Sequence, residues 1–274
     1  MATTGITSTS STSSVTTSSK TLPSATVDIA SLSSSEVAAL GTSALSALTT
    51  TQLAAITADA LPGLSLAQLT AIPTSVIITL STDQISSLTK LQLSYIPTAT
   101  LQNLSTAQIA ALSGSQIAGL TQTQISNLTT NQVSKLTEEQ IGALSNPQVI
   151  SLTALQVQSL STAQISALSS AQIGAMSTSQ ISNLTTAGIN TIASSDSQIQ
   201  SLTTGQISAF STTQISTLFA LGSLGFTNSQ VSGITSTQLQ AITTKQLNEF
   251  SNNQIKALTA YQVGALTTAQ FNSY

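Results

Sequence analysis

The side chains of this sequence that could do acid–base chemistry are few and scattered. Eight carboxylates and five lysines are spread over 274 residues. The only carboxylates close together are Glu138 and Glu139, and as neighbours in the chain they do not point the same way from a helix or a strand. Serine and threonine are abundant, but there is no histidine to activate a hydroxyl as a nucleophile. We therefore expect no catalytic residues and no enzymatic activity.

The missing residue types exclude further classes of function. Cysteine, histidine, arginine and tryptophan are all absent. Cysteine and histidine are the main protein ligands of zinc and iron–sulfur centres, so we expect neither a metal site nor a cofactor. Without arginine and at a net charge of −3, the chain lacks the basic surface that binds nucleic acid.

Two further expectations concern membranes and export. Apolar runs stop at four residues, as in Ile109 to Leu112, far short of the roughly 18–20 that a membrane-spanning helix needs. We therefore expect no membrane span. Residues 1–20 contain no apolar segment of the kind found in Sec signal peptides.

An eight-residue repeat organises the chain. From Ser105 the sequence reads STAQIAAL, SGSQIAGL, TQTQISNL, which is the pattern [ST]-x-x-Q-[IV]-x-x-L. Thirty-one such octads and the two-residue insertion Ala193-Ser194 account for residues 25–274. The fourth position is glutamine except in eight octads, which carry Asp28, Glu36, Ala44, Ala60, Val76, Thr100, Gly188 and Gly222.

The residue types of the octad predict that a helix begins in every repeat. A serine or threonine followed three positions later by glutamine is a capping box, in which each side chain binds the backbone amide of the other residue. The isoleucine at position five and the leucine that ends the preceding octad form the accompanying hydrophobic staple. In the octad Thr137–Leu144, Thr137 is the cap, Gln140 closes the box, and Ile141 and Leu144 point inward.

These signals favour an all-α repeat solenoid of short capped helices, one per octad. A single continuous helix would rotate each octad by about 80° and leave no stable apolar stripe. A β-solenoid is the main alternative, because Thr, Ile and Val favour strands. The spacing of the apolar residues by three and five positions, not by two, argues against strands.

The repeat array has defined boundaries and irregularities. Residues 1–24 are a Ser/Thr-rich tail with little to bury, and residues 25–274 form the solenoid. We expect the insertion at 193–194 to bulge one turn. The octad Phe219–Phe226 (FALGSLGF) has lost both cap and glutamine, and Gly222 and Gly225 are expected to break its helix.

Aromatic residues concentrate towards the end of the array. Phe210 and Phe250 occupy inward positions and fit ordinary core packing. Phe271 and Tyr274 belong to the final octad, which no later octad of this sequence covers. Because the end of a solenoid needs a cap or a partner, we take Phe271 and Tyr274 as candidate assembly residues.

The octads resemble the LTxxQIxxL-type tandem repeats of large bacterial surface and exported proteins, which are adhesin-like. The resemblance covers residues 25–274 and implies an extracellular or cell-surface location in a bacterium, without catalytic residues. We expect a structural protein that self-assembles into a filament or surface layer, with itself as partner and cell-surface or matrix components as further ones. The alternative is a monomeric surface adhesin or a ligand-binding solenoid, and ice is one of the ligands considered.

Overall fold

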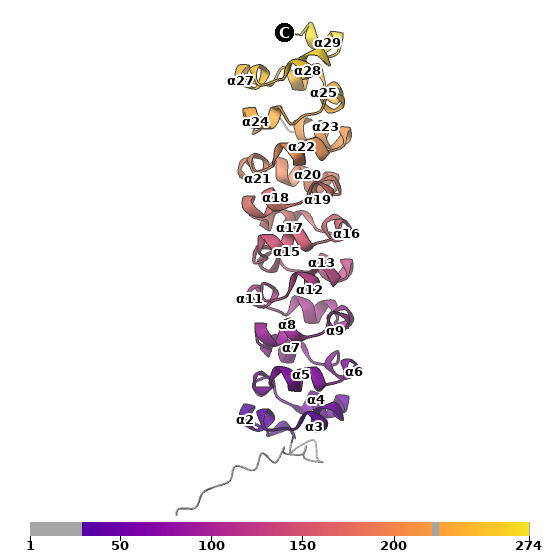
Figure 1. The fold of residues 1–274 in the computed structure, drawn as a ribbon, viewed down its shortest axis with the longest axis vertical. Coiled ribbons are helices and arrows are strands. Elements are labelled where there is room, and N and C mark those ends of the chain that lie inside the picture. Colours follow the sequence, from indigo (N-terminus) through magenta and orange to yellow (C-terminus); the bar gives the residue numbers. More distant parts are fainter. Residues whose placement is uncertain (1–28, 221–224, 274) are drawn as a thin grey trace, which may run out of the picture.

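The computed structural model describes residues 29–220 and 225–273, which form a rod of short helices stacked along one axis (Figure 1). These residues contain 28 α-helices and one 3-10 helix, and no β-strand. The all-α repeat solenoid predicted from the octads is confirmed, and the β-solenoid alternative is wrong. The tail 1–24, residues 221–224 and Tyr274 lie outside the described residues.

The helices follow one another at intervals of one octad. Those of the first half are α2 (Ser34–Ala38), α3 (Thr42–Ser46), α4 (Thr50–Ala55), η1 (Leu61–Gly63), α5 (Leu66–Ala71), α6 (Thr74–Ile77), α7 (Thr82–Ser87), α8 (Lys90–Tyr95), α9 (Thr98–Asn103), α10 (Thr106–Ala110), α11 (Gly114–Ile117), α12 (Gln122–Asn127), α13 (Thr130–Ser134), α14 (Glu138–Gly142) and α15 (Asn146–Ser151). Those of the second half are α16 (Ala154–Gln158), α17 (Thr162–Ala167), α18 (Ser170–Ala175), α19 (Thr178–Ser182), α20 (Thr186–Ala193), α21 (Asp196–Gln200), α22 (Thr204–Ala209), α23 (Thr212–Ala220), α24 (Asn228–Val231), α25 (Ser236–Ala241), α26 (Thr244–Leu247), α27 (Asn252–Lys256), α28 (Ala260–Gly264) and α29 (Thr268–Phe271).

The capping box predicted from the sequence starts most of these helices. At α14 the backbone amide of Gln140 donates to Thr137 Oγ1 at 3.2 Å, and the Thr137 amide donates to Gln140 Oε1 at 2.8 Å. Thr137 itself has extended backbone angles, φ −73° and ψ 163°. Two of the amides that a helix N-terminus leaves unpaired are thereby satisfied within four residues.

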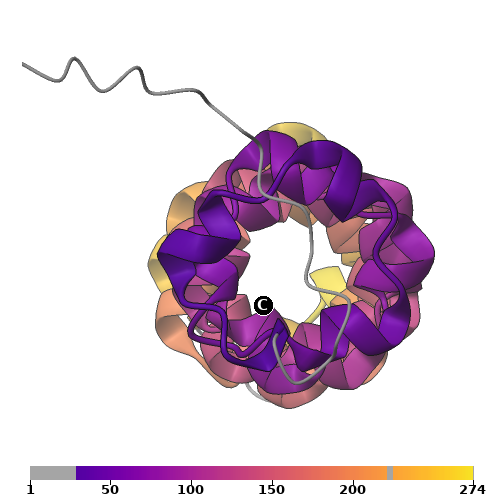
Figure 2. The ribbon, with the colours of Figure 1, turned by 90° about the horizontal axis from the view of Figure 1, so that it is seen from below.

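The apolar positions of the octad build one continuous core. Ile141, at position five, is fully buried, and Leu144, at position eight, is 4% exposed. The same holds from Ile29 to Phe250, so a single column of side chains fills the centre of the ring of helices seen down the rod in Figure 2. Burial of the staple residues confirms the inward assignment made from the sequence.

The glutamine has a second role, which links successive coils of the solenoid. Gln140 Nε2 donates to the backbone oxygens of Ile109 and Leu112, at 2.9 and 2.5 Å, in the octad four repeats earlier. Each fourth-position glutamine from Gln68 onward donates to an earlier coil in this way. We call this set of bonds the glutamine ladder.

The ladder fixes the size of a coil. Gln140 lies 28 residues after Leu112 and 31 after Ile109, while α14 packs against α11 and α17, three octads away on either side. A coil therefore contains between three and four octads. Octads of one coil consequently sit over the junctions between octads of the coil before.

Prolines alter single repeats without interrupting the stack. Pro62 lies at position six of its octad, and that octad forms the 3-10 helix η1 in place of an α-helix. Pro73 and Pro97 are N-caps of α6 and α9, where the missing amide hydrogen is tolerated.

The insertion at 193–194 lengthens a helix. α20 has eight residues and buries both Ile189 and Ile192. The Ser195 amide then donates to Ile192 O at 3.1 Å, so no amide remains for Gln198, whose Oε1 is buried without a partner. The extra residues are thus accommodated as helix, at the cost of one capping box.

The degenerate octad 219–226 does not begin a helix of its own at Phe219. α23 continues from the preceding octad through Phe219 to Ala220, because no cap stops it there. Phe219 packs on Phe226 and Phe250 at ring-centroid distances of 5.1 and 5.2 Å. Gly222 lies outside the described residues, so the predicted break there is not tested.

Replacing Gln140, Gln148 and Gln156 together with alanine is expected to lower the free energy of unfolding by about 1–3 kcal/mol per residue, because each loss leaves buried amide and carbonyl groups unpaired. Denaturant titration followed by circular dichroism measures this. The control is Ser166→Ala, at an exposed position six; an equal effect of the control and the glutamine set would show that the ladder does not stabilise the fold.

Gln140→Glu separates the two roles of the side chain. Glu36 shows that a carboxylate can close the box, since its Oε2 accepts from the Ser33 amide at 3.0 Å. A charged carboxylate cannot donate to Leu112 O, whereas a protonated one can. Burial against carbonyl oxygens raises the pKa of this carboxyl in the folded state above about 4.3, the ordinary glutamate value. We therefore expect this variant to be destabilised at pH 7 and to recover stability relative to the wild type as the pH falls towards about 4.3, with no further recovery below it. A pH-independent deficit would contradict the donor role.

Candidate assembly face at the C-terminal end

The inward side chains of the last coil are less covered than those of the interior. Val263, at position five, is 39% exposed and Phe271 is 61% exposed, whereas interior residues at this position such as Ile141 are fully buried. Ile255, Leu258 and Leu266 are half-buried. In the interior these positions are covered by the following coil, and no described residue covers them here.

These five side chains surround one apolar cavity. Ile255, Leu258, Val263, Leu266 and Phe271, from α27, α28 and α29 and the residues after them, line a space of about 240 Å³. We call this surface the C-terminal face. An exposed apolar concavity of this kind is a common feature of protein–protein contact sites.

Backbone oxygens on the C-terminal face also lack the partners they have elsewhere. Leu112 O and Leu120 O, at position eight of interior octads, accept from glutamines of a later coil at 2.5 and 2.7 Å. Leu258 O and Leu266 O occupy the same position and have no donor among the described residues. The face therefore combines apolar surface with acceptors in a fixed register.

The sequence-predicted assembly residues are only partly placed by the structure. Phe271 lies on the C-terminal face, whereas Tyr274 is outside the described residues. The prediction missed Ile255, Leu258, Val263 and Leu266. Octad position was the signal that could have found them, because positions five and eight point inward in every coil and need a following coil to bury them.

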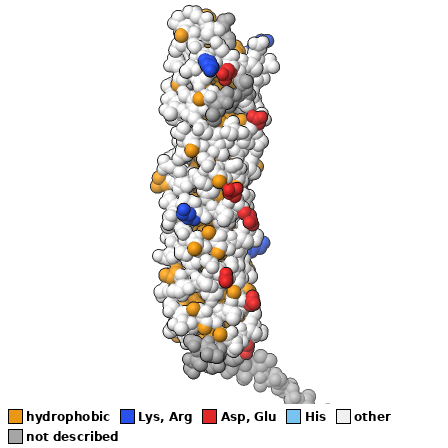
Figure 3. All heavy atoms as spheres, turned by 180° about the vertical axis from the view of Figure 1, so that it is seen from behind, with side chains coloured by type: hydrophobic (Ala, Val, Ile, Leu, Met, Phe, Trp, Pro, Cys, Tyr) orange, Lys and Arg blue, Asp and Glu red, His pale blue; other side chains and the backbone are white. Residues whose placement is uncertain are grey.

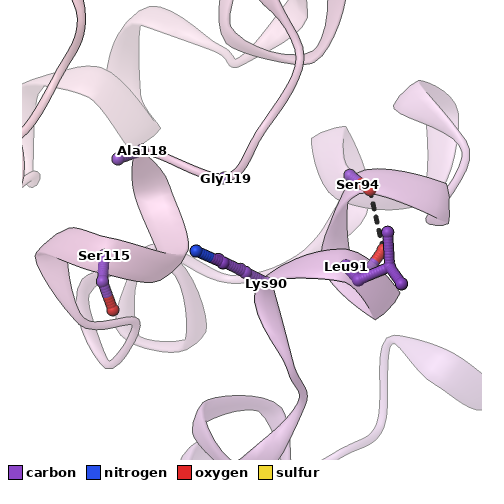
Figure 4. A pocket seen from close by; sticks show the side chains of 6 residues that line it. All are labelled: Lys90, Leu91, Ser94, Ser115, Ala118 and Gly119. Atoms are coloured by element: carbon purple, nitrogen blue, oxygen red, sulfur yellow. Dashed lines mark hydrogen bonds between the residues drawn. The ribbon is translucent and has the colours of Figure 1, made fainter.

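The side wall of the rod has shallow grooves that carry few reactive side chains. One of about 410 Å³ lies between α8 and α11, where Lys90 extends towards Ser115 and Gly119 (Figure 4). Ser94 Oγ donates to Leu91 O at 2.7 Å, inside its own helix. No carboxylate lines this groove, so Lys90 has no acid–base partner in it.

The carboxylates singled out in the sequence are not brought into a catalytic arrangement. Glu138 and Glu139 are both exposed in the first turn of α14, where a helix dipole favours negative charge. With Lys135 they border a wall groove of about 560 Å³. Within 29–220 and 225–273, no three carboxylates gather into a group that could hold a metal ion, and no helix has the length and apolar character to cross a bilayer.

Three stretches of the chain are similar to a known repeat family. Residues 92–130, 149–186 and 240–273 match the ALTTAQ repeat. This is a tandem-repeat protein. The letters ALTTAQ occur at Ala265–Gln270, where Leu266 is the staple residue, Thr267 the cap and Gln270 the residue that closes the box. The six-residue ALTTAQ segment thus contains one staple residue and one capping box. It spans the boundary between two octads.

The first matched stretch lies in the N-terminal half of the described rod, the second near its middle and the third at its C-terminal end, and the octad pattern continues between them. No curated protein matches the chain.

Phe271→Asp is expected to change the free energy of unfolding by less than about 0.5 kcal/mol, because the side chain is largely exposed. Phe250→Asp is the matched comparison. Phe250 is 7% exposed and packs on Phe219, so a buried charge there is expected to cost more than about 3 kcal/mol. Denaturant titration of both variants gives the comparison; similar losses would mean that Phe271 belongs to the core.

Proposed function

We propose that this chain is an extracellular structural protein of a bacterium, whose rods self-assemble into a filament or surface layer. The observation that carries the proposal is the long, almost uncharged wall. Figure 3 shows isolated charged side chains on a surface that is otherwise uncharged polar and apolar. Charged residues make up 5% of the chain and the net charge is −3. Low net charge removes much of the repulsion that keeps soluble proteins apart.

Apolar side chains on the wall supply contact surface for such packing. Leu91, Tyr95, Ile150 and Leu155 are each at least 50% exposed, although the octad provides inward positions for apolar residues. A rigid rod also presents such a wall without a large entropy cost on association, because its helices are already ordered. Side-by-side packing of rods therefore has both an apolar contribution and little electrostatic opposition.

The resemblance to bacterial surface repeats supports the extracellular location, with cell-surface or matrix components as further partners. The alternative function is a monomeric surface adhesin or ligand-binding solenoid. Ice is one possible ligand of such a solenoid. Between the structural protein and the monomeric adhesin, we propose the structural protein. We propose no catalytic role.

Sedimentation velocity and electron microscopy of the purified wild type are expected to show assemblies many times larger than the 27.8 kDa chain. A variant with Leu91→Lys, Ile150→Lys and Leu155→Lys is expected to give folded single rods, because the substitutions place charge on the contact surface. Lysines at the exposed residues Thr130, Thr162 and Thr186 add the same charge as a control and are expected to leave the assemblies intact.

A wild type that stays as dispersed single rods at high concentration would contradict self-assembly and leave the adhesin as the better function. Equal effects of the two lysine sets would show that charge, and not the apolar wall residues, controls association.

A further inference from the structure

The glutamine ladder does not join all coils equally. Its acceptors include the backbone oxygens of position-eight residues, as when Gln140 Nε2 donates to Leu112 O in the octad four repeats earlier. From Leu80 to Leu152, ten consecutive position-eight oxygens each receive such a bond. The ten donors lie in residues 105–184, which we call the continuous segment.

The ladder has gaps in residues 41–104, which we call the gapped segment. Val76 and Thr100 occupy fourth positions there. A glutamine at those two positions would reach the backbone oxygens 28 residues earlier, Leu48 O and Ile72 O. Leu48 and Ile72 are each only 4% exposed, and their oxygens have no donor among the described residues. Two buried carbonyl groups are therefore left without the bond that the ladder supplies elsewhere.

Both of these gaps occur where the N-cap of the helix is a proline. Pro73 and Pro97 cap α6 and α9, and proline has no amide hydrogen. A glutamine three residues later would lack the cap amide that binds its Oε1, as the Thr137 amide binds Gln140. The capping box and the ladder are thus lost together in these two octads.

The residues at the two gaps compensate only in part. Val76 adds a buried apolar side chain, but it donates no hydrogen bond. Thr100 Oγ1 pairs with Thr74 Oγ1 at 2.9 Å, which joins α9 to α6 and leaves Ile72 O without a donor. A buried carbonyl without a partner destabilises the folded state. The coils of the gapped segment are consequently held together less strongly than those of the continuous segment.

We propose that residues 41–184 open in a fixed order, in which the gapped segment unfolds locally while the continuous segment stays folded. A solenoid permits this because each coil contacts only its neighbours, so that stability varies along the rod. A rod under tension would lengthen first within residues 41–104. The inference depends on the ladder and not on how rods associate.

Hydrogen–deuterium exchange measured by mass spectrometry in dilute solution tests this order. The comparison is between equivalent backbone amides, those of position-five and position-eight residues, such as Leu53 in the gapped segment and Ile141 in the continuous one. In the wild type we expect protection factors in the gapped segment to be at least about tenfold lower, because two bonds between coils are missing there.

Two sets of variants test whether the ladder is the cause. Gln132→Val with Gln156→Thr copies the two gaps, at the same spacing in the chain, into the continuous segment. This variant is expected to lower the protection factors of that segment at least about tenfold. Pro73→Ser with Val76→Gln restores one cap and one donor, and is expected to raise protection in the gapped segment about tenfold. Pro73→Ser alone restores only the cap and is the matched control.

Three results would overturn the proposal. The first is equal protection of the two segments in the wild type. The second is unchanged protection in the folded variant with Gln132→Val and Gln156→Thr, since the ladder donors would then not set the order of opening. The third is an equal gain from Pro73→Ser with and without Val76→Gln, which would assign the difference to the proline cap. This last comparison decides the proposal even where the gap variant does not fold, which circular dichroism shows.

Discussion

The buried amide of the fourth-position glutamine is the interaction on which the rest of this solenoid depends. A helix of four to six residues is too short to be stable alone, and most of its backbone polar groups lie at unpaired termini. The glutamine serves both kinds of terminus at once. Its oxygen accepts from the N-cap amide of its own helix, and its nitrogen donates to the C-terminal carbonyls of a helix in the preceding coil. A glutamate could do the first and an alanine neither.

Because the ladder bonds join residues 28–33 positions apart, local helix starts and distant coil packing are coupled. A coil stabilises its neighbours and is stabilised by them, as in other repeat proteins whose units cannot fold alone. Where the ladder is interrupted, additional apolar side chains are buried. Gly188 offers no side-chain amide, and the helix that contains it, α20, is longer than its neighbours and buries both Ile189 and Ile192. Beyond it, α23 runs on to bury Leu218 and Phe219.

The repeat that builds the ladder also explains why the surface of the rod consists mainly of small uncharged polar residues. Positions four, five and eight are used for the box, the core and the staple, and the remaining exposed positions are filled mainly with small polar residues. A wall built this way carries few groups with catalytic potential, and Glu138 and Glu139 stay exposed in one helix turn. What distinguishes one part of the surface from another is then the departures from the repeat, such as Leu91 and Ile150 on the wall and the uncovered side chains at the C-terminal face.

The sequence alone determined where each helix begins, because the capping box and the staple are local. Thr137, Gln140 and Ile141 lie within five residues, and their types specify the cap, the box and the inward direction with no reference to the rest of the chain. The same reasoning predicted a bulge where the extra residues instead extended α20. It placed Phe271 in an assembly role but missed Val263 and its neighbours.

Only the tertiary structure decided how many octads make a coil and what the glutamine nitrogen binds. Nothing within eight residues encodes the distance from Gln140 to Leu112, since that contact depends on how successive helices turn around the axis. The exposure of the C-terminal face is likewise a property of stacking, because Ile141 and Val263 occupy the same octad position and differ only in whether another coil covers them.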